Sequence, residues 1–229
     1  DRERAMSETT TTGSTRIWDL PLRLFHWTLV PLFGFSWWSG ENHEMEWHRL
    51  SGYCILALLV FRIWWGFTGS RTARFSQFVR GPGTVGAYAR TLFSRSSHAA
   101  DGHNPLGGWS VVAMLAGLVL MVGAGLFAVD VDGLESGPLA DYVSFDQGRA
   151  ASELHEIVFK VMMILVIGHV AAIMFYLHVK RQNLVRPMVT GRRAAAAGDS
   201  DVRWSPVLAL AGLAIAGALA WAVSTGFRF

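Results

Sequence analysis

Long apolar runs set the fold class of this chain. Five stretches with few charged side chains cover residues 17–39, 47–68, 106–129, 154–179 and 206–225. A bilayer core about 30 Å thick is crossed by roughly 20 helical residues, each rising about 1.5 Å. Since 52% of the residues are hydrophobic and only 16% are charged, the composition does not fit an ordinary soluble domain. The sequence predicts an all-α integral membrane protein.

The charges of the connecting segments alternate in sign along the chain. Arginine dominates between the second and third runs, and lysine and arginine dominate after the fourth, whereas the segments after the first and third runs are acidic. Lys and Arg stay preferentially on the cytoplasmic side of a membrane. We therefore expect a multi-pass topology with a cytoplasmic N-terminus and a periplasmic C-terminus. The basic residues are scattered rather than gathered on one face, so no nucleic acid is expected as a partner.

Histidines recur within the apolar runs. Ionisable side chains inside a membrane are costly and mark functional sites by default. His155 and His169 are fourteen residues apart. In a helix this spacing places them on one face, within about 40° of each other and about 21 Å apart along the axis. They therefore belong to two different levels of the membrane.

Two further histidines match these levels. His26 and His169 lie at similar depths from the cytoplasmic ends of their runs, whereas His48 and His155 both stand at the outer starts of theirs. A four-helix bundle with inward-facing histidines at matched depths forms two imidazole pairs. Two imidazoles alone coordinate zinc poorly, but they satisfy the two axial positions of a haem iron. The pattern predicts one haem iron bound by His26 and His169 on the cytoplasmic side and another bound by His48 and His155 on the outer side.

Glycines beside these positions would leave room for a flat macrocycle. Gly52 follows His48 by one helical turn, and the third run contains Gly117, Gly123 and Gly125. Clearance for a haem and close helix contact explain these glycines about equally well. The single cysteine, Cys54, is interpreted as a packing residue.

The remaining histidines are less suitable as haem ligands. His43 is a minor alternative ligand for the outer pair, and His178 points to the helix face opposite His169. A capping or interfacial role is favoured for His103, and His98 is expected to be solvated.

Several motifs together resemble a known family. They are "WDLPLRLFHW" at 18–27, "HRLSGY" at 48–53, "GHNPLGGW" at 102–109, the two histidines fourteen residues apart and "RQNLVRPMVTGRR" at 181–193. In these motifs the chain resembles the bacterial cytochrome b561 and nickel-iron hydrogenase b-type cytochrome family, which is similar to the membrane subunit of formate dehydrogenase. The resemblance covers about residues 16–193. It implies two b-type haems in a four-helix core, with the histidine pairing inferred above, and a place in the bacterial inner membrane. Haem propionates in this family are expected to meet basic groups, for which Arg23 and Arg49 are candidates.

The expected organisation has four parts. A disordered extension (1–15) precedes a di-haem cytochrome b domain (16–193), which is followed by a linker (194–204) and an additional C-terminal transmembrane helix (205–229). The segment "RGPGTVGAYARTLF" at 80–93 is a candidate interfacial helix. The predicted fold is a four-helix transmembrane bundle holding two haems, plus the fifth helix.

The expected function is electron transfer between the quinone pool and a redox partner, such as a cytochrome c or a dehydrogenase subunit, across or within the membrane. No catalytic residue is assigned, and the four histidines are expected to bind the cofactor only. Two alternatives stay open: a haem-containing anchor subunit of a larger dehydrogenase or cytochrome complex, and a stand-alone superoxide:quinone oxidoreductase. A proton or metal transporter is disfavoured because it would need acidic side chains at mid-depth, and the runs contain none there.

Overall fold

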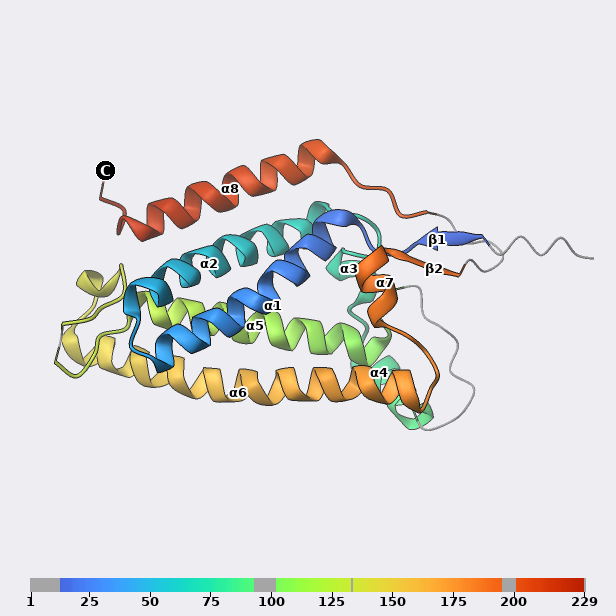
Figure 1. Ribbon diagram of the computed structural model, residues 1–229, viewed down its shortest axis with the longest axis horizontal. Coiled ribbons are helices and arrows are strands. Elements are labelled where there is room, and N and C mark those ends of the chain that lie inside the picture. Colours follow the sequence, from blue (N-terminus) through green and yellow to red (C-terminus); the bar gives the residue numbers. More distant parts are fainter. Residues whose placement is uncertain (1–12, 93–101, 133, 195–200, 229) are drawn as a thin grey trace, which may run out of the picture.

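Five long helices lying side by side form the body of the described chain (Figure 1). The computed structural model describes residues 13–92, 102–132, 134–194 and 201–228. The long helices are α1 (Leu20–Glu41), α2 (Met45–Thr68), α5 (Pro105–Phe127), α6 (Phe145–His178) and α8 (Pro206–Ser224). Shorter elements connect them, namely α3 (Phe75–Phe78), α4 (Pro82–Thr91), the 3-10 turn η2 (Ala140–Tyr142) and α7 (Val185–Thr190).

The membrane prediction is confirmed for four of the described helices. By length and composition, α2, α5, α6 and α8 are long and apolar enough to cross a bilayer. Their exposed surfaces carry large apolar side chains such as Phe67, Ile164 and Val207, which would be unfavourable in water but are suited to lipid. α1 does not belong to this group, since Arg23 and His26 lie in its first two turns. A fifth membrane span therefore stays a prediction.

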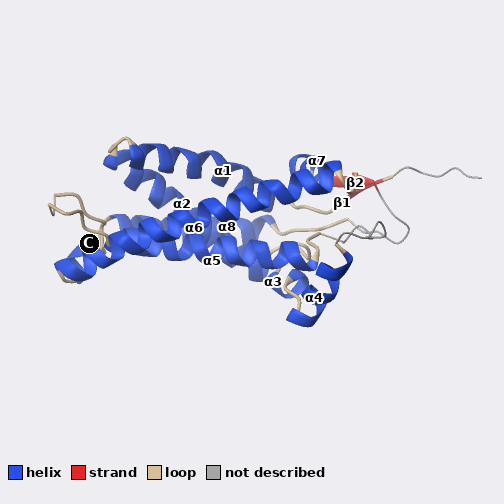
Figure 2. Ribbon diagram, turned by 90° about the horizontal axis from the view of Figure 1, so that it is seen from below, coloured by secondary structure: helices blue, strands red, loops and turns tan. Residues whose placement is uncertain are grey.

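The connections of unlike charge lie at opposite ends of the bundle. The acidic end, as we name it, holds the turn from α1 to α2 and the connection from α5 to α6, together with the C-terminal end of α8 (Figure 1). The basic end holds α3, α4, α7 and the start of α1. Figure 2 shows that the two short strands also lie at the basic end. The described N-terminal and C-terminal segments are thus at opposite ends of the molecule.

The two strands pair residues that are far apart in sequence. β1 (Ser14–Arg16) runs antiparallel to β2 (Arg192–Ala194), and the backbone N–H of Ile17 donates to the Gly191 carbonyl over 2.9 Å. The sequence reasoning did not predict this pairing. The rest of the expected disordered extension, residues 1–12, lies outside the described residues, as do residues 195–200 of the expected linker. The domain boundaries stay predictions.

A buried carboxylate fastens α1 to α2 at the basic end. Asp19 is the N-cap of α1 and accepts from the Leu22 N–H over 2.7 Å. It also accepts from the Trp65 indole N–H over 3.0 Å and from the Ser70 hydroxyl. Capping satisfies a free N–H at the helix start, and the two side-chain donors hold the end of α2 against it.

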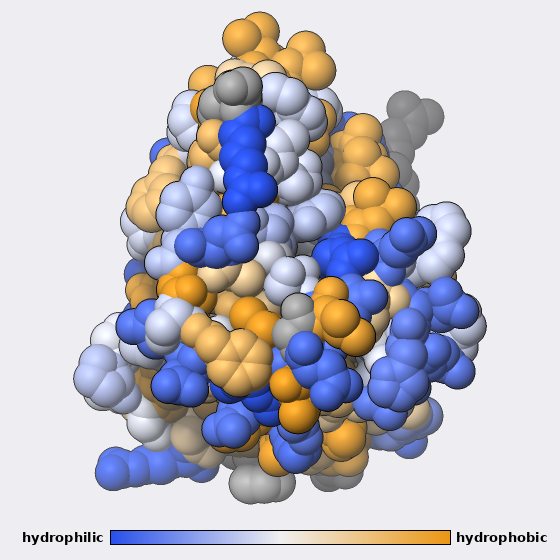
Figure 3. Space-filling model, turned by 90° about the vertical axis from the view of Figure 1, so that its left-hand side faces the viewer, coloured by the Kyte–Doolittle hydropathy of each residue, from blue (hydrophilic) through white to orange (hydrophobic). Residues whose placement is uncertain are grey.

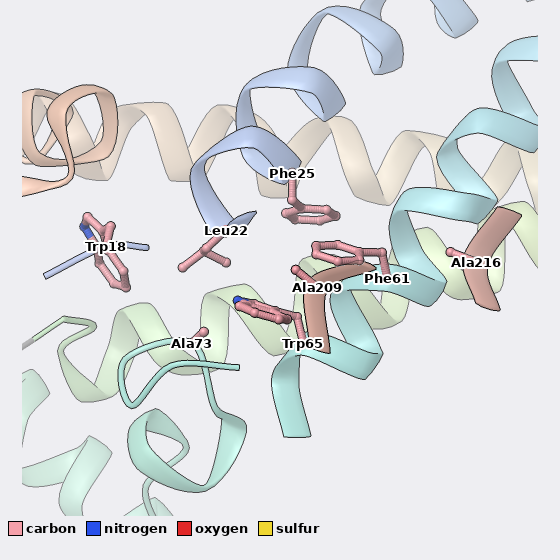
Figure 4. Close-up of a cluster of buried hydrophobic side chains, with 8 residues drawn as sticks. All are labelled: Trp18, Leu22, Phe25, Phe61, Trp65, Ala73, Ala209 and Ala216. Carbon is pink, nitrogen blue, oxygen red and sulfur yellow. The ribbon is translucent and has the colours of Figure 1, made fainter. Parts of the chain in front are cut away.

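An apolar cluster beside Asp19 extends this contact to the last helix. Figure 4 shows its eight side chains meeting from α1, α2 and α8 and from the segments around them: Trp18, Leu22, Phe25, Phe61, Trp65, Ala73, Ala209 and Ala216. In addition, the Trp64 indole N–H donates to the Leu208 carbonyl over 2.9 Å. α8 therefore packs against α2.

A second apolar cluster joins the other helices. It consists of Ile55, Leu59, Leu118, Met121, Val122, Val158 and Met162 from α2, α5 and α6. α6 begins at residue 145, well before the apolar run that starts at 154, because Ser144 and Gln147 form a capping box. Hydropathy marks where a helix becomes apolar, whereas capping marks where it begins. With 34 residues, α6 is about 51 Å long and extends beyond the hydrocarbon core.

Of two smaller predictions, the helix within 80–93 is present while its interfacial position stays a prediction, and the interpretation of Cys54 is wrong. α4 forms within the candidate interfacial segment, and its Tyr88 hydroxyl shares a hydrogen bond of 2.7 Å with the Tyr176 hydroxyl of α6.

Cys54 is exposed, so its interpretation as a packing residue is wrong. It lies on an outward face of α2 because the packed face of this part of the helix is occupied by Ile55 and Leu59.

Candidate functional site

One predicted histidine pair is brought together at the acidic end of the bundle. The rings of His48, in the first turn of α2, and His155, in α6, have centroids 5.9 Å apart and planes inclined by 78°. The Nδ1 atom of His48 lies 2.9 Å from the Ser36 carbonyl oxygen, and that of His155 lies 2.7 Å from the Met121 carbonyl oxygen. Neighbouring helices, α1 and α5, therefore orient the two rings.

These hydrogen bonds also determine which ring nitrogen can bind a metal. A carbonyl oxygen only accepts, so each Nδ1 must carry the proton and donate it. The Nε2 atom of each ring then keeps a free lone pair. Metal-binding histidines typically have their second ring nitrogen held in this way, because the hydrogen bond sets the tautomer and the ring orientation.

A cavity of about 90 Å³ lies beside the pair. Its lining includes Gly52 and Gly125 as well as aromatic side chains of α1 and α6. A Cβ atom at Gly125 would lie 3.0 Å from the His155 Nδ1, and one at Gly40 would lie 3.1 Å from the His48 Nδ1. A Cβ at Gly52 would meet no atom within 4 Å. Backbone without side chains thus lies against both imidazoles, with open space next to them.

The structure separates the two explanations for the glycines of α5. A Cβ at Gly117 would lie 2.5 Å from the Met162 Sδ, so this glycine permits close contact of α5 with α6. Gly125 lies against His155, whereas a Cβ at Gly123 would meet nothing within 4 Å. Close helix packing explains Gly117, and clearance around the histidine pair explains Gly125.

The donor set of this site suits a haem better than a bare metal ion. No group of three or more His, Cys, Asp or Glu side chains that could hold a metal ion occurs in the described part of the chain. A structural zinc ion needs about four protein ligands, whereas a porphyrin supplies the equatorial nitrogens of its iron and needs only axial ones. Two opposed imidazoles with free Nε2 atoms therefore fit haem.

The second predicted pair lies at the basic end. His26 of α1 and His169 of α6 are near enough to interact electrostatically, and both are partly buried. The His26 ring packs edge-on against Trp27 at 5.0 Å between centroids. Its Nδ1 is buried and has no hydrogen-bond partner among the described residues. The structure thus brings these histidines to one region without the ring-to-ring contact seen at the acidic end.

Unpartnered polar atoms accumulate around this second pair. Within the part of the chain that the structure describes, the buried nitrogens without a partner include Nε of Arg23, Nδ1 of His26, both terminal nitrogens of Arg62 and Nδ1 of His103. Covered polar groups in folded proteins nearly always have partners, and exceptions indicate an absent water, ion or ligand. The basic end therefore has donors available to a polar group that the chain does not supply.

Arg62 and His103 were not among the predicted site residues. The His103 ring lies between Trp18 and Phe78, with centroid distances of 4.7 and 4.8 Å. Burial first, and then the charges of Arg62 and His169, lower its pKa to about 3. The predicted capping role is wrong for His103, because the adjacent Asn104 caps α5 by accepting from the Gly107 N–H, whereas an interfacial position stays a prediction. A charged residue within an apolar run, such as Arg62, was a signal that the sequence offered.

The other candidates occupy less suitable positions. His43 is exposed in the turn after α1 with a positive φ of 57°, and His178 is exposed at the end of α6. His98 lies outside the described residues. Of the two arginines expected near haem propionates, Arg49 forms an ion pair with Glu135 and also lines the cavity, whereas Arg23 donates to the Val189 carbonyl.

Comparison with known proteins identifies one family. Residues 17–191 match the family model described as prokaryotic cytochrome b561. The match includes α1, α2, α5 and α6, and therefore both histidine pairs, but it ends before α8. No curated protein and no solved structure matches the chain.

Proposed function

Because the chain belongs to the prokaryotic cytochrome b561 family and is thus a b-type cytochrome of membrane electron transfer, we propose that it carries two haem b groups. In this proposal electrons pass between the quinone pool and a redox partner. The observation that supports the proposal most directly is the His48–His155 pair, with rings 5.9 Å apart and both Nδ1 atoms held by carbonyls.

Four histidines would hold the two groups. His48 and His155 would bind the iron at the acidic end, and His26 and His169 would bind the iron at the basic end. Bound haem supplies the one-electron change of its iron. The protein contributes the axial nitrogens, the orientation of the rings and the apolar surroundings. Since imidazole must be neutral to bind a metal, acid is expected to weaken both sites.

Aromatic side chains of α1 and α6 line the acidic-end site. Phe159 of α6 stacks on Phe33 of α1 with centroids 6.4 Å apart and also contacts Trp37 at 5.9 Å. These contacts connect α1 to α6 beside the His48–His155 pair. They would keep water away from the acidic-end haem, while the helix itself holds His155 and His169 about 21 Å apart along α6.

The acidic surface at this end of the bundle favours binding of a soluble, positively charged partner. Exposed Glu41, Glu44 and Glu46 lie around the turn from α1 to α2, close to His48. Figure 3 views this end and shows hydrophilic side chains spread across it among apolar ones. Complementary charge accelerates encounters and orients them. A basic redox protein such as a cytochrome c fits this surface, as does a basic dehydrogenase subunit.

Haem counting after single substitutions tests the proposal. The intact protein, purified in mild detergent, should contain two dithionite-reducible b-type haems per chain. His155→Ala or His48→Ala should each remove the acidic-end haem and leave one, and His26→Ala or His169→Ala should remove the other. His43→Ala is the matched control and should retain two. Loss of no haem in the His155→Ala protein would refute the assignment.

Reduction by quinol tests separately whether the chain exchanges electrons with the quinone pool. A short-chain quinol added to the purified protein should reduce at least one haem if the chain exchanges electrons with the quinone pool. A protein with both haems that quinol does not reduce would instead favour a role as a haem-containing anchor in a larger complex.

A further inference from the structure

Arg62 is a buried cation whose terminal nitrogens have no hydrogen-bond partner among the described residues. It lies within α2, six residues before the helix ends at Thr68, and only 1% of its surface is exposed. Neither Nη1 nor Nη2 has a partner within the described residues. The guanidinium lies over the Phe75 ring, 4.9 Å from its centroid. Covering a charge in this way is unfavourable unless an opposite charge or several acceptors compensate for it.

The carboxylate that interacts electrostatically with Arg62, that of Asp19, already accepts hydrogen bonds from other groups. Asp19 interacts with Arg62 at longer range, but its oxygens accept from the Leu22 N–H, the Trp65 indole and the Ser70 hydroxyl. No ion pair between Asp19 and Arg62 is formed. Asp19 therefore offsets part of the charge of Arg62 without satisfying its terminal N–H groups.

Arg62 lies in the same region as the histidine pair at the basic end, since the Phe75 ring below it contacts Phe78, which in turn contacts His103. His103 interacts electrostatically with both Arg62 and His169, and His169 interacts with His26. The free nitrogens of Arg62 therefore belong to the same region as the second pair of histidines. At the acidic end, the cavity-lining Arg49 already has Glu135 as its anion.

We propose that Arg62 binds a propionate carboxylate of the haem held by His26 and His169. This assignment rests on the proposed function. A guanidinium presents a planar fork of donors that matches a carboxylate, and such charge-assisted pairs are among the strongest hydrogen bonds in proteins. Arg62 replaces Arg23 as the principal partner, because both terminal nitrogens of Arg62 lack a partner among the described residues, whereas one terminal nitrogen of Arg23 already donates to the Val189 carbonyl.

A resident group explains these observations better than a lipid headgroup does. Arg62 lies about 9 Å inside the end of its helix, and the Phe75 ring covers it. A Cβ at Gly66, one turn further along α2, would also lie against the Phe75 ring. Phe75 therefore closes the approach to Arg62 from the helix end. A lipid phosphate at the surface would have to displace this aromatic side chain, whereas a haem within the bundle would not.

The reduction potential of the basic-end haem provides the test. A nearby positive charge favours the reduced haem, which carries one negative charge more than the oxidised form. Arg62→Gln removes this charge with little change in side-chain volume. The substitution is made in the His155→Ala protein, so that only the basic-end haem remains and its potential is measured alone.

We expect the equilibrium constant for reduction to fall about tenfold in the Arg62→Gln protein, a shift of about 59 mV to lower potential for one electron. Arg62→Lys keeps the charge and should shift the potential much less. Arg74→Gln is the control, since Arg74 is an exposed cation at the same end, and it should leave the potential unchanged.

Haem retention gives a second readout if the potential cannot be measured. Loss of the basic-end haem from the Arg62→Gln protein but not from the Arg62→Lys protein supports the pairing. Equal loss from both indicates a packing role and overturns it, as does an unchanged potential in Arg62→Gln. In those cases two haems in the unsubstituted chain would still support the proposed function, whereas their absence would overturn both proposals.

Discussion

At the scale of single residues, the glycines beside the acidic-end histidines are as informative as the histidines themselves. A Cβ at Gly40 would lie 3.1 Å from the His48 Nδ1, and a Cβ at Gly125 would lie 3.0 Å from the His155 Nδ1. Since carbonyls from α1 and α5 hold the same nitrogens, neither ring can move away without losing its hydrogen bond. The glycines therefore maintain the separation of the two rings.

Gly125→Val should weaken haem binding at the acidic end. The new side chain would press on the His155 ring and disturb its hydrogen bond to Met121. Loss of such an orienting interaction weakens metal binding by about tenfold or more. The haem content per chain measures the effect. Gly123→Val is the matched control, because a Cβ there meets no atom within 4 Å, and equal haem loss in both variants would contradict the explanation.

His103 should make the stability of the protein depend on pH. Its pKa is lowered to about 3 in the folded chain, chiefly by burial, whereas an unfolded histidine titrates near 6.5. Its contribution is therefore fully present above pH 6.5 and is lost as the pH falls toward 3. Between pH 7.5 and 5 the free energy of unfolding should fall by about 1–2 kcal/mol from this residue.

Unfolding in mixed micelles at several pH values checks this prediction. His103→Phe keeps an aromatic ring between Trp18 and Phe78 and should flatten the pH profile over this range. The exposed His43 provides the control, and His43→Ala should retain the slope of the unsubstituted protein. Identical slopes in all three proteins would show that His103 does not determine the pH dependence.

At the scale of elements, the long helices are held together by polar contacts at their ends and apolar clusters between them. Asp19 joins α1 to α2, and Tyr176 joins α6 to the segments around α4 and α5. The Tyr176 hydroxyl lies 2.7 Å from the Tyr88 hydroxyl and accepts from the Asn104 amide over 2.9 Å. The short helix α4 is thus hydrogen-bonded to α6 through Tyr176, in addition to its packing against α5.

Tyr176→Phe should loosen α4 without unfolding the bundle. Removal of the hydroxyl leaves Tyr88 and the Asn104 amide without this partner, which costs about 1–2 kcal/mol. Amide hydrogen exchange in α4 (Pro82–Thr91) should become roughly tenfold faster. Tyr142→Phe is the control, since the Tyr142 hydroxyl donates to the Gly226 carbonyl at the acidic end. Unchanged exchange in the Tyr176→Phe protein would show that other contacts hold α4.

At the scale of the whole molecule, the described ends of the chain lie at opposite ends of the bundle (Figure 1). An odd number of membrane crossings produces this arrangement, which agrees with five spans if α1 crosses together with the four apolar helices. The charge of the connections then predicts the orientation, with the basic segments on the cytoplasmic side.

Reporter fusions should establish this orientation. Alkaline phosphatase fused after α8 should be active because it reaches the periplasm, and a fluorescent protein fused at the N-terminus should fluoresce because it remains in the cytoplasm. The exchanged fusions are the controls and should both be inactive. Alkaline phosphatase activity from an N-terminal fusion, or fluorescence from a C-terminal one, would reverse the predicted topology.

Features set by local periodicity could be predicted from the sequence. The lengths of the apolar runs predicted the helices, and the fourteen residues between His155 and His169 placed them on one face of α6. Both inferences depend only on the rise and turn of an α-helix. The pairing of His48 with His155 followed from their matched depths, and the structure brings these rings to 5.9 Å.

Contacts between distant segments were decided only by the tertiary structure. The pairing of Ser14 with Ala194, the packing of His103 between Trp18 and Phe78 and the covering of Arg62 by Phe75 all join residues whose relation has no local periodicity. A sequence shows that Arg62 is charged and lies within an apolar run, but burial and the absence of a partner depend on how neighbouring helices pack. The sequence alone determined the number and depth of the candidate ligands, and the fold determined which other side chains surround them.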